Sequence, residues 1–208
     1  MPYNIIATNT YGVIDADNFE NTSFLTGGQG SCLVVYVLNK DANGKPIAAA
    51  MAHILSANLN SAKMVKNPNG TTRREYSPVS KDTCRERLGG FWSNHLHDAR
   101  KDNVFIFTGQ EPIETTKEAV KAVQAAISDN PGLPREVVKL NTSHYGVAPA
   151  NGSIIENNIP AWMFVRTRLI QLAGTEKPLV TAIMDKGVSG NTLVENADFD
   201  SNMRSLEL

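Results

Sequence analysis

Two apolar runs separated by a short polar turn constrain the fold of this chain more than any other feature of the sequence. The first run, Cys32 to Leu38, is rich in β-branched and aromatic residues, and the second extends from Ile47 to Leu55. The turn between them contains Asp41-Ala42-Asn43-Gly44, and Asn-Gly is a strong signal for a hairpin turn. The pattern therefore predicts a β-hairpin early in the chain.

The register of this hairpin decides whether a thiol and an imidazole lie on the same face of the sheet. A four-residue loop places Cys32 opposite His53, whereas a two-residue Asn-Gly loop places Cys32 opposite Leu55, with His53 one diagonal step away. Only the register between these two separates the side chains onto opposite faces. The thiolate is the nucleophilic form of cysteine and needs a base at neutral pH. The hairpin therefore predicts Cys32 as a nucleophile and His53 as its general base.

A glycine-rich run, Thr26-Gly27-Gly28-Gln29-Gly30-Ser31, comes directly before Cys32. Glycines permit unusual backbone angles and close approach of a substrate, and backbone N–H groups in such a turn can stabilise an oxyanion. We therefore expect Gly30 and Ser31 to position a substrate beside the thiol. The alternative interpretation is structural, with Cys32 as a small buried hydrophobic residue and His53 as a half-buried residue whose hydrogen bonds are satisfied.

Other reactive side chains give weaker signals. His144 is an alternative base for Cys32, because catalytic partners are often distant in sequence. Cys84 has basic neighbours that favour a low thiol pKa, but local geometry places no histidine beside it. The segment His95-Leu96-His97-Asp98 offers alternate metal ligands if it is a strand, but no second cluster completes a site. We expect neither a metal nor an organic cofactor.

The other patterns mix strands and helices. The first 24 residues indicate only short strands or loop, and residues 58–100 indicate an insertion or an irregular flap. Further elements are expected as strands at Val104 to Phe107, Val137 to Leu140 and Leu179 to Met184, and as helices from Pro112 to Ile127 and from Pro160 to Leu172. We therefore expect one domain over residues 1–208, of the α+β class, with a mixed β-sheet packed against helices.

Composition and charge bear on the partners of the chain. Lys and Arg total 20 against 21 Asp and Glu, so the chain lacks the broad positive field of most nucleic-acid-binding proteins. No stretch approaches the roughly 20 apolar residues of a membrane-spanning helix, and the amino terminus lacks the pattern of a signal peptide. We expect no nucleic-acid partner, no membrane insertion and synthesis in the cytoplasm, from which a specialised secretion system could export the protein.

The run from Thr26 to Cys32, followed by a hairpin and Met51-Ala52-His53, resembles the chemoreceptor glutamine deamidases, the CheD family. That family has a threonine six residues before a cysteine in a Gly-Ser-Cys turn and a histidine on the next strand, and these positions match Thr26, Cys32 and His53. The resemblance implies a cysteine-dependent enzyme that converts glutamine side chains of a target protein to glutamate and releases ammonia. It also implies that Thr26 orients the histidine.

The resemblance is incomplete, and other functions share its chemistry. Weaker similarity continues at Ile155 to Ile159 and at Asp185 to Gly190, whereas Ala50 stands where the family has glycine. Glutamine-deamidating toxins related to cytotoxic necrotizing factor have a similar Cys-His arrangement, so a bacterial effector is a second interpretation. A protease or transglutaminase uses the same nucleophile and base. A non-enzymatic protein-binding module on the same fold is the remaining alternative.

Overall fold

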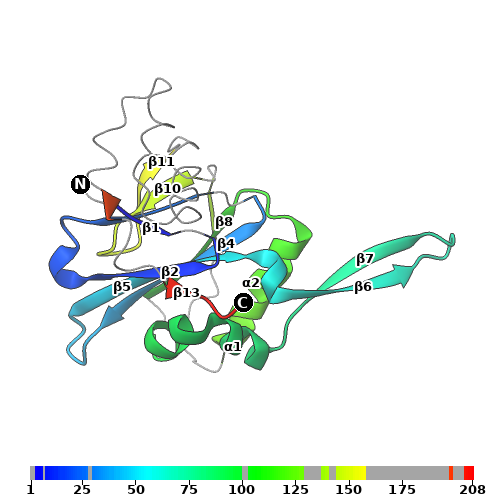
Figure 1. The fold of residues 1–208 in the computed structure, drawn as a ribbon, viewed down its shortest axis with the longest axis horizontal. Helices are drawn as coiled ribbons and strands as arrows, with labels where there is room; N and C mark the ends of the chain where they lie inside the picture. The colour runs from blue at the N-terminus through cyan, green and yellow to red at the C-terminus, as the bar shows by residue number, and fades with distance from the viewer. Residues whose placement is uncertain are drawn as a thin grey trace, which may run out of the picture.

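The computed structural model of the chain describes residues 3–6, 8–27, 30–99, 103–128, 137–140, 144–157, 197–198 and 204–208. These residues form three layers, with two β-sheets packed face to face and α-helices covering the outer face of one of them (Figure 1). The α+β class and the mixed sheet expected from the sequence are confirmed.

A six-stranded sheet forms the middle layer, with the strand order β13-β2-β5-β4-β8-β9. Its strands are β2 (Thr10–Asp15), β4 (Cys32–Lys40), β5 (Pro46–Leu55), β8 (Val104–Gly109), β9 (Val137–Leu140) and β13 (Arg204–Ser205). Neighbouring strands are antiparallel except β8 and β9, which are parallel. The predicted strands at residues 104–107 and 137–140 are therefore confirmed.

A five-stranded sheet, with the order β11-β10-β3-β1-β12, packs on one face of the middle layer. Its strands are β1 (Tyr3–Ile6), β3 (Ser23–Gly27), β10 (His144–Val147), β11 (Ile154–Asn157) and β12 (Ala197–Asp198). Apolar side chains of both sheets fill the space between them, including Phe24, Tyr36, Met51, Phe107 and Tyr145. Burial of such large side chains supplies much of the free energy that holds the two sheets together.

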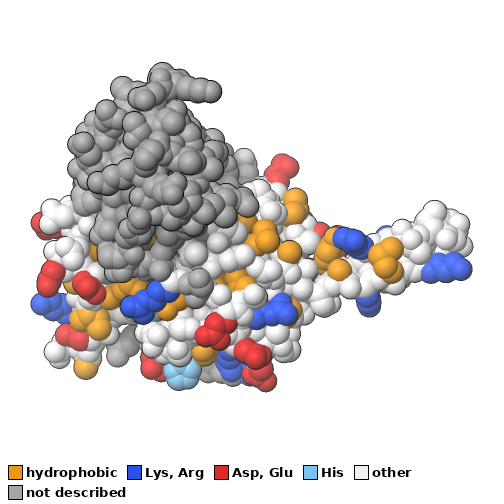
Figure 2. Space-filling view, in the orientation of Figure 1, with side chains coloured by type: hydrophobic (Ala, Val, Ile, Leu, Met, Phe, Trp, Pro, Cys, Tyr) orange, Lys and Arg blue, Asp and Glu red, His pale blue; other side chains and the backbone are white. Residues whose placement is uncertain are grey.

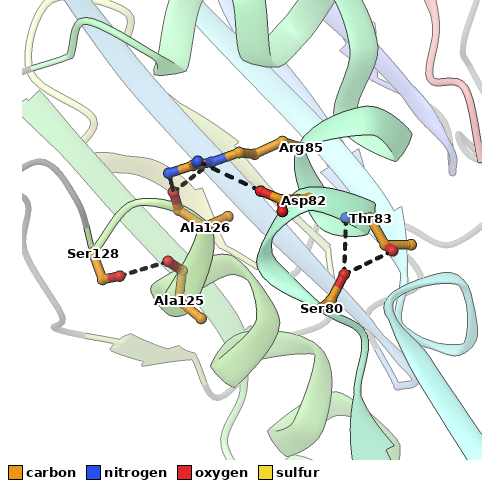
Figure 3. Close-up of polar contacts among 7 residues, drawn as sticks. All are labelled: Ser80, Asp82, Thr83, Arg85, Ala125, Ala126 and Ser128. Atoms are coloured by element: carbon orange, nitrogen blue, oxygen red, sulfur yellow. Dashed lines mark hydrogen bonds and ion pairs between the residues drawn. The ribbon is translucent and has the colours of Figure 1, made fainter.

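Two α-helices, α1 (Lys81–Phe91) and α2 (Glu114–Ala126), cover the other face of the six-stranded sheet. The Ser80 hydroxyl caps α1 by accepting a hydrogen bond of 3.1 Å from the Thr83 backbone N–H. Arg85 on α1 donates from Nε to the Ala126 carbonyl at the end of α2, at 3.0 Å, and so joins the two helices (Figure 3). No helix in the described part of the chain is long and apolar enough to cross a membrane.

The segment expected to be an insertion or irregular flap is regular. Strands β6 (Asn60–Lys66) and β7 (Thr72–Pro78) form a separate two-stranded hairpin that projects from the layered body (Figure 1). Helix α1 follows it, and Cys84, Leu88 and Phe91 of this helix are fully buried in the core between helices and sheet. The irregular-flap interpretation was therefore wrong, because apolar residues at helical spacing make α1 an integral layer of the fold.

The sequence also predicted two helices and one further strand. Helix α2 begins at Glu114, so Ile113, assigned to its apolar face, lies before the first turn and is 49% exposed. The helix predicted after Pro160 and the strand predicted at Leu179 to Met184 lie outside the described residues.

Candidate functional site between the two sheets

The β4–β5 hairpin brings Cys32 and His53 to the same face of the six-stranded sheet. Cys32 pairs with Leu55 and Val34 pairs with His53, so the thiol and the imidazole are diagonal neighbours. This is the register that the sequence associated with a two-residue Asn-Gly loop. Because Val34 is part of the cluster between the sheets, Cys32 and His53 also face the five-stranded sheet.

A β-bulge sets this register, not a two-residue loop. Asp41 and Lys45 close the turn through a hydrogen bond of 2.9 Å from the Asp41 N–H to the Lys45 carbonyl, and Lys40 pairs with Pro46. The next pair along the hairpin is Asn39 with Ala48, so Ile47 is an extra residue in β5. Without Ile47 in the bulge, this turn would put Cys32 and His53 on opposite faces.

Thr26 on β3 meets His53 across the space between the sheets. The Thr26 Oγ1 atom lies 2.9 Å from His53 Nδ1, and both residues are fully buried. The same hydroxyl donates a hydrogen bond of 3.0 Å to the Ile6 carbonyl of β1. Since its single proton is used there, Thr26 Oγ1 accepts the N–H of His53 Nδ1. The contacts therefore assign the imidazole tautomer that carries its proton on Nδ1 and leaves Nε2 unprotonated.

Burial keeps His53 neutral at physiological pH. Desolvation lowers the pKa of His53 to about 4, against a smaller opposing effect of a hydrogen bond to the Ile6 backbone. The Nε2 atom is buried and has no hydrogen-bond partner among the described residues. A neutral imidazole with a free Nε2 lone pair is the form that accepts a proton in general base catalysis.

The thiol of Cys32 is also protected from water. Cys32 is 3% exposed, and desolvation raises its pKa to about 11, with a smaller lowering effect of a hydrogen bond to the Ser31 side chain. Neither ring nitrogen of His53 hydrogen-bonds to Cys32, because Nδ1 contacts Thr26 and Nε2 has no partner in the described part of the chain. The raised pKa of the thiol and the lowered pKa of the imidazole therefore favour a neutral pair over a preformed thiolate–imidazolium pair.

The glycine-rich run differs in part from the expected flexible turn. Thr26 and Gly27 belong to β3, a strand buried along its whole length. Gly30 is exposed, does not have a positive φ, and has no atom of the described residues within 4 Å of the position that a Cβ would occupy. Ser31 is half-buried, and its carbonyl accepts a hydrogen bond of 3.0 Å from the Ser56 N–H. The backbone beside Cys32 is thus open to solvent at Gly30 and anchored at Ser31.

Other candidate residues lie elsewhere. Cys84 is fully buried on the inner face of α1. Arg85 and Arg87 lower its pKa as expected, but desolvation outweighs them and raises the pKa of this thiol to about 12. His95 lies in a π-helical turn, Trp92–Leu96, and not in a strand, and its Nδ1 accepts a hydrogen bond of 2.9 Å from Asn39. Among the residues that the structure describes, no three His, Cys, Asp or Glu side chains are grouped to hold a metal.

The alternative base, His144, begins β10. Its backbone pairs with Gly27, and the next pair in the same ladder joins Tyr145 to Thr26. The side chain of His144 lies outside the described residues. The Ile6 carbonyl also contributes to the site, because it accepts the hydrogen bond that the Thr26 hydroxyl donates. No pattern in the sequence predicted this contact.

The burial of His53 predicts a measurable loss of stability in acid. The unfolded chain protonates this imidazole near its ordinary pKa of 6.5, whereas the folded chain resists protonation down to about 4. The unfolded state therefore binds more protons between these values, so the free energy of unfolding decreases as the pH falls through this window and levels off below it. The difference in pKa corresponds to about 3 kcal/mol. Urea unfolding at a series of pH values measures it.

A His53→Asn variant is the control for this measurement. Asparagine keeps an amide N–H that can donate to Thr26, but it does not titrate in this range. The variant should lose the decrease in stability between pH 6.5 and about 4 that wild type shows. An equal decrease in both proteins would assign the acid sensitivity to other groups.

Comparison of the chain with protein-family models, with curated protein sequences and with solved structures finds no match.

Proposed function

We propose that this protein is a cysteine-dependent protein glutamine deamidase, in which Cys32 is the nucleophile, His53 the general base and Thr26 the residue that orients the base. The observation that carries the proposal is the buried hydrogen bond of 2.9 Å between Thr26 Oγ1 and His53 Nδ1, with Cys32 one diagonal step away on the same sheet face. A nucleophile, a base and a third group that orients the base are the parts that covalent amide hydrolysis requires.

The orienting contact supports a catalytic role because it controls where the imidazole proton resides. The Ile6 carbonyl engages the hydroxyl proton of Thr26, and the hydroxyl oxygen then holds the Nδ1 proton of His53. A base that takes a proton from a thiol needs its free lone pair on the other nitrogen, which is Nε2. A threonine carries no charge, so it fixes the ring without the stabilisation of the imidazolium that a carboxylate would add.

In the proposed reaction, His53 Nε2 takes the thiol proton as the Cys32 sulfur attacks the carboxamide carbon of a glutamine side chain. The carbonyl oxygen becomes an oxyanion, for which the backbone N–H groups near Gly30 and Ser31 are the proposed donors. As the C–N bond breaks, Nε2 returns its proton to the nitrogen and ammonia leaves. Water then attacks the thioester with His53 again as base, which releases glutamate and restores the thiol.

The burial of the thiol favours a side-chain amide over a backbone amide as the substrate. Cys32 is only 3% exposed, whereas Gly30 two residues before it is exposed and has open space around it. A glutamine side chain is a slender, unbranched group that can reach a recessed sulfur, whereas a peptide bond in a folded segment cannot without extensive rearrangement. This argument supports deamidation over proteolysis.

Mass spectrometry of a defined substrate tests the proposed reaction. We expect incubation with an unfolded, glutamine-rich protein such as reduced casein to release ammonia and to add roughly one dalton per converted glutamine, with no cleavage and no cross-linking. Cleavage products would instead establish a protease, and incorporation of an added primary amine would establish a transglutaminase.

Removal of the Thr26 hydroxyl should impair catalysis more than stability. Thr26→Val keeps the shape of the side chain but frees the imidazole to rotate and change tautomer, so we expect kcat to fall on the order of 10-fold to 100-fold, the usual range for a lost orienting partner. Thr26→Ser keeps the hydroxyl and should recover most of the activity. Steady-state kinetics together with urea unfolding separate the two effects.

Thr116 supplies the matched control for this substitution. It is also a buried threonine, and its Oγ1 accepts a hydrogen bond of 3.1 Å from Ser56, but it lies on α2 in the core between helices and sheet. Thr116→Val should cost a similar free energy of unfolding and leave kcat unchanged. Equal losses of kcat in the two valine variants would contradict an orienting role for Thr26.

A further inference from the structure

The hairpin of β6 and β7, residues 60–78, forms an arm with a firmly attached base. At the base, the Asn60 side chain donates hydrogen bonds of 2.6 Å to the Ser56 carbonyl and 3.4 Å to the Thr115 carbonyl, and the Val79 N–H donates to the Leu59 carbonyl at 3.1 Å. Leu59 is fully buried, and Val79 packs on the core. The two strands thus leave the body in a fixed direction (Figure 1).

Beyond its base, the arm is largely exposed along both strands. A two-stranded hairpin is marginally stable by itself in water, because it buries little apolar surface. Its turn is well ordered by hydrogen bonds from the Gly70 N–H to the Asn67 carbonyl at 3.0 Å and from the Asn67 N–H to the Thr71 carbonyl at 2.7 Å. A long, regular and exposed ribbon is the shape of an element that contacts a partner.

The arm has a net positive charge, although the whole chain is nearly neutral. It contains four basic residues and one acidic residue, so its net charge is +3, whereas the whole chain has a net charge of −1 and the rest of it therefore carries −4. Glu75 contacts Lys63 at 3.0 Å and Arg73 at 3.8 Å. Lys66 and Arg74 form no ion pair with any residue that the structure describes. The sequence expectation of no nucleic-acid partner was based on the overall balance, which does not detect this segregation.

The basic side chains occupy both faces of the arm. Cross-strand partners share a face, and the pairs Met64 with Arg74 and Lys66 with Thr72 define one face, whereas Lys63 with Glu75 and Val65 with Arg73 define the other. Figure 2 shows Lys and Arg side chains spread along the projecting ribbon. An acidic protein surface packed on the arm would contact only one of these two faces and would leave the basic side chains of the other face without a partner. A groove of duplex DNA presents phosphates along both of its walls and therefore complements both faces.

The dimensions of the arm also fit such a groove. Each strand has seven residues, which corresponds to a length of about 23 Å at about 3.3 Å per residue. The major groove of B-form DNA is about 12 Å wide and admits a two-stranded β-ribbon. In A-form RNA the corresponding groove is deep and narrow, and side chains cannot read it.

We propose that the β6–β7 arm binds B-form duplex DNA by entering the major groove, with Lys63, Lys66, Arg73 and Arg74 contacting the phosphates on its two sides. Such contacts release counterions from the DNA and provide affinity without sequence preference. This binding is independent of the proposed deamidation, because the arm shares no residue with the site of Cys32 and His53.

Fluorescence anisotropy with a fluorescein-labelled 20-base-pair duplex of mixed sequence tests the proposal. We expect a Kd between about 10⁻⁶ and 10⁻⁴ M at physiological salt. With four phosphate contacts, log K should fall with log salt concentration with a slope of roughly −3 to −4. The full-length Cys32→Ser protein can be used, so the result does not depend on any catalytic activity.

Two charge reversals of equal size test whether the arm makes the contact. Arg74→Glu should weaken binding by at least about 10-fold and make the salt slope shallower by about one. Lys45→Glu, at an exposed position in the turn between β4 and β5, makes the same change in net charge and should leave the affinity within about twofold of wild type. Both residues are exposed, so neither change should disturb folding.

Three results would overturn the proposal. The first is no binding at 50 mM salt with 100 µM protein, since even non-specific contacts are detectable under those conditions. The second is an equal loss of affinity in Arg74→Glu and Lys45→Glu, which would show that binding depends on the overall electrostatic field of the protein and not on contacts of the arm. The third is equal affinity for an RNA duplex of the same sequence, which would exclude insertion into the B-form major groove.

Discussion

Replacement of Cys32 by serine is expected to abolish ammonia release from glutamine while the protein remains folded. Serine is nearly isosteric with cysteine, but its hydroxyl is a far weaker nucleophile, and a neutral His53 with a pKa of about 4 is too weak a base to ionise it. We expect kcat/KM to fall by at least about 10³-fold, as is usual when a nucleophile that acts together with its base is removed.

Cys84 provides a matched control within the same chain. Both thiols are buried and both have pKa values raised by desolvation, so serine at either position places a hydroxyl in an apolar environment. Each change should cost about 1 to 3 kcal/mol of stability if the hydroxyl finds no partner. Only Cys32→Ser should lose activity. A folded Cys32→Ser protein with normal turnover, or equal inactivation by both changes, would contradict the assignment of Cys32 as the nucleophile.

The candidate site could be located from the sequence because a hairpin converts linear spacing into contacts. The Asn-Gly turn and the two apolar runs define the hairpin, and alternation along its strands limits Cys32 and His53 to a few relative positions. The choice among registers could not be made from the sequence. It depends on the bulge at Ile47, which is 51% exposed and carries no residue type that distinguishes a bulge from a regular strand.

The environment of the pair was not predictable from local patterns. Thr26 stands in a run of glycines, which indicates a flexible turn, yet it is fully buried in a strand of the second sheet. Its position depends on β1 pairing in parallel with β3, a tertiary contact that brings the Ile6 carbonyl to the Thr26 hydroxyl. The resemblance to the deamidase family implied an orienting role for Thr26, but the atoms that fix its hydroxyl came only from the three-dimensional arrangement.

The pKa values of the site also depend on tertiary packing. Spacing along the hairpin indicates that a thiol and an imidazole are neighbours, but burial between two sheets decides that both are neutral at pH 7. A neutral pair requires the proton to move from sulfur to Nε2 during the attack on the substrate, and not before it. In the proposed reaction, the low pKa of His53 makes the imidazolium a strong acid that can protonate the amide nitrogen as it leaves as ammonia.

Replacement of His53 by asparagine is expected to lower kcat/KM by about 10² to 10⁴, the range typical of general acid–base catalysis. Asparagine preserves a donor to Thr26 but has no group that can take the thiol proton. In wild type, kcat/KM should fall as the pH decreases through about 4, because protonation of Nε2 removes the base, and the variant should lack this acid limb. Far-UV circular dichroism at each pH confirms that the protein is still folded where the rate is measured.

His95→Asn is the control for this last experiment. Burial lowers the pKa of His95 as it does that of His53, but His95 contacts Asn39 at the other end of β4 from Cys32. Its replacement should therefore leave both the rate and the acid limb unchanged. If His53→Asn keeps normal turnover, or if its acid limb coincides with that of wild type, another group is the base. His144, whose backbone pairs with Gly27 next to Thr26, would then be the first residue to replace.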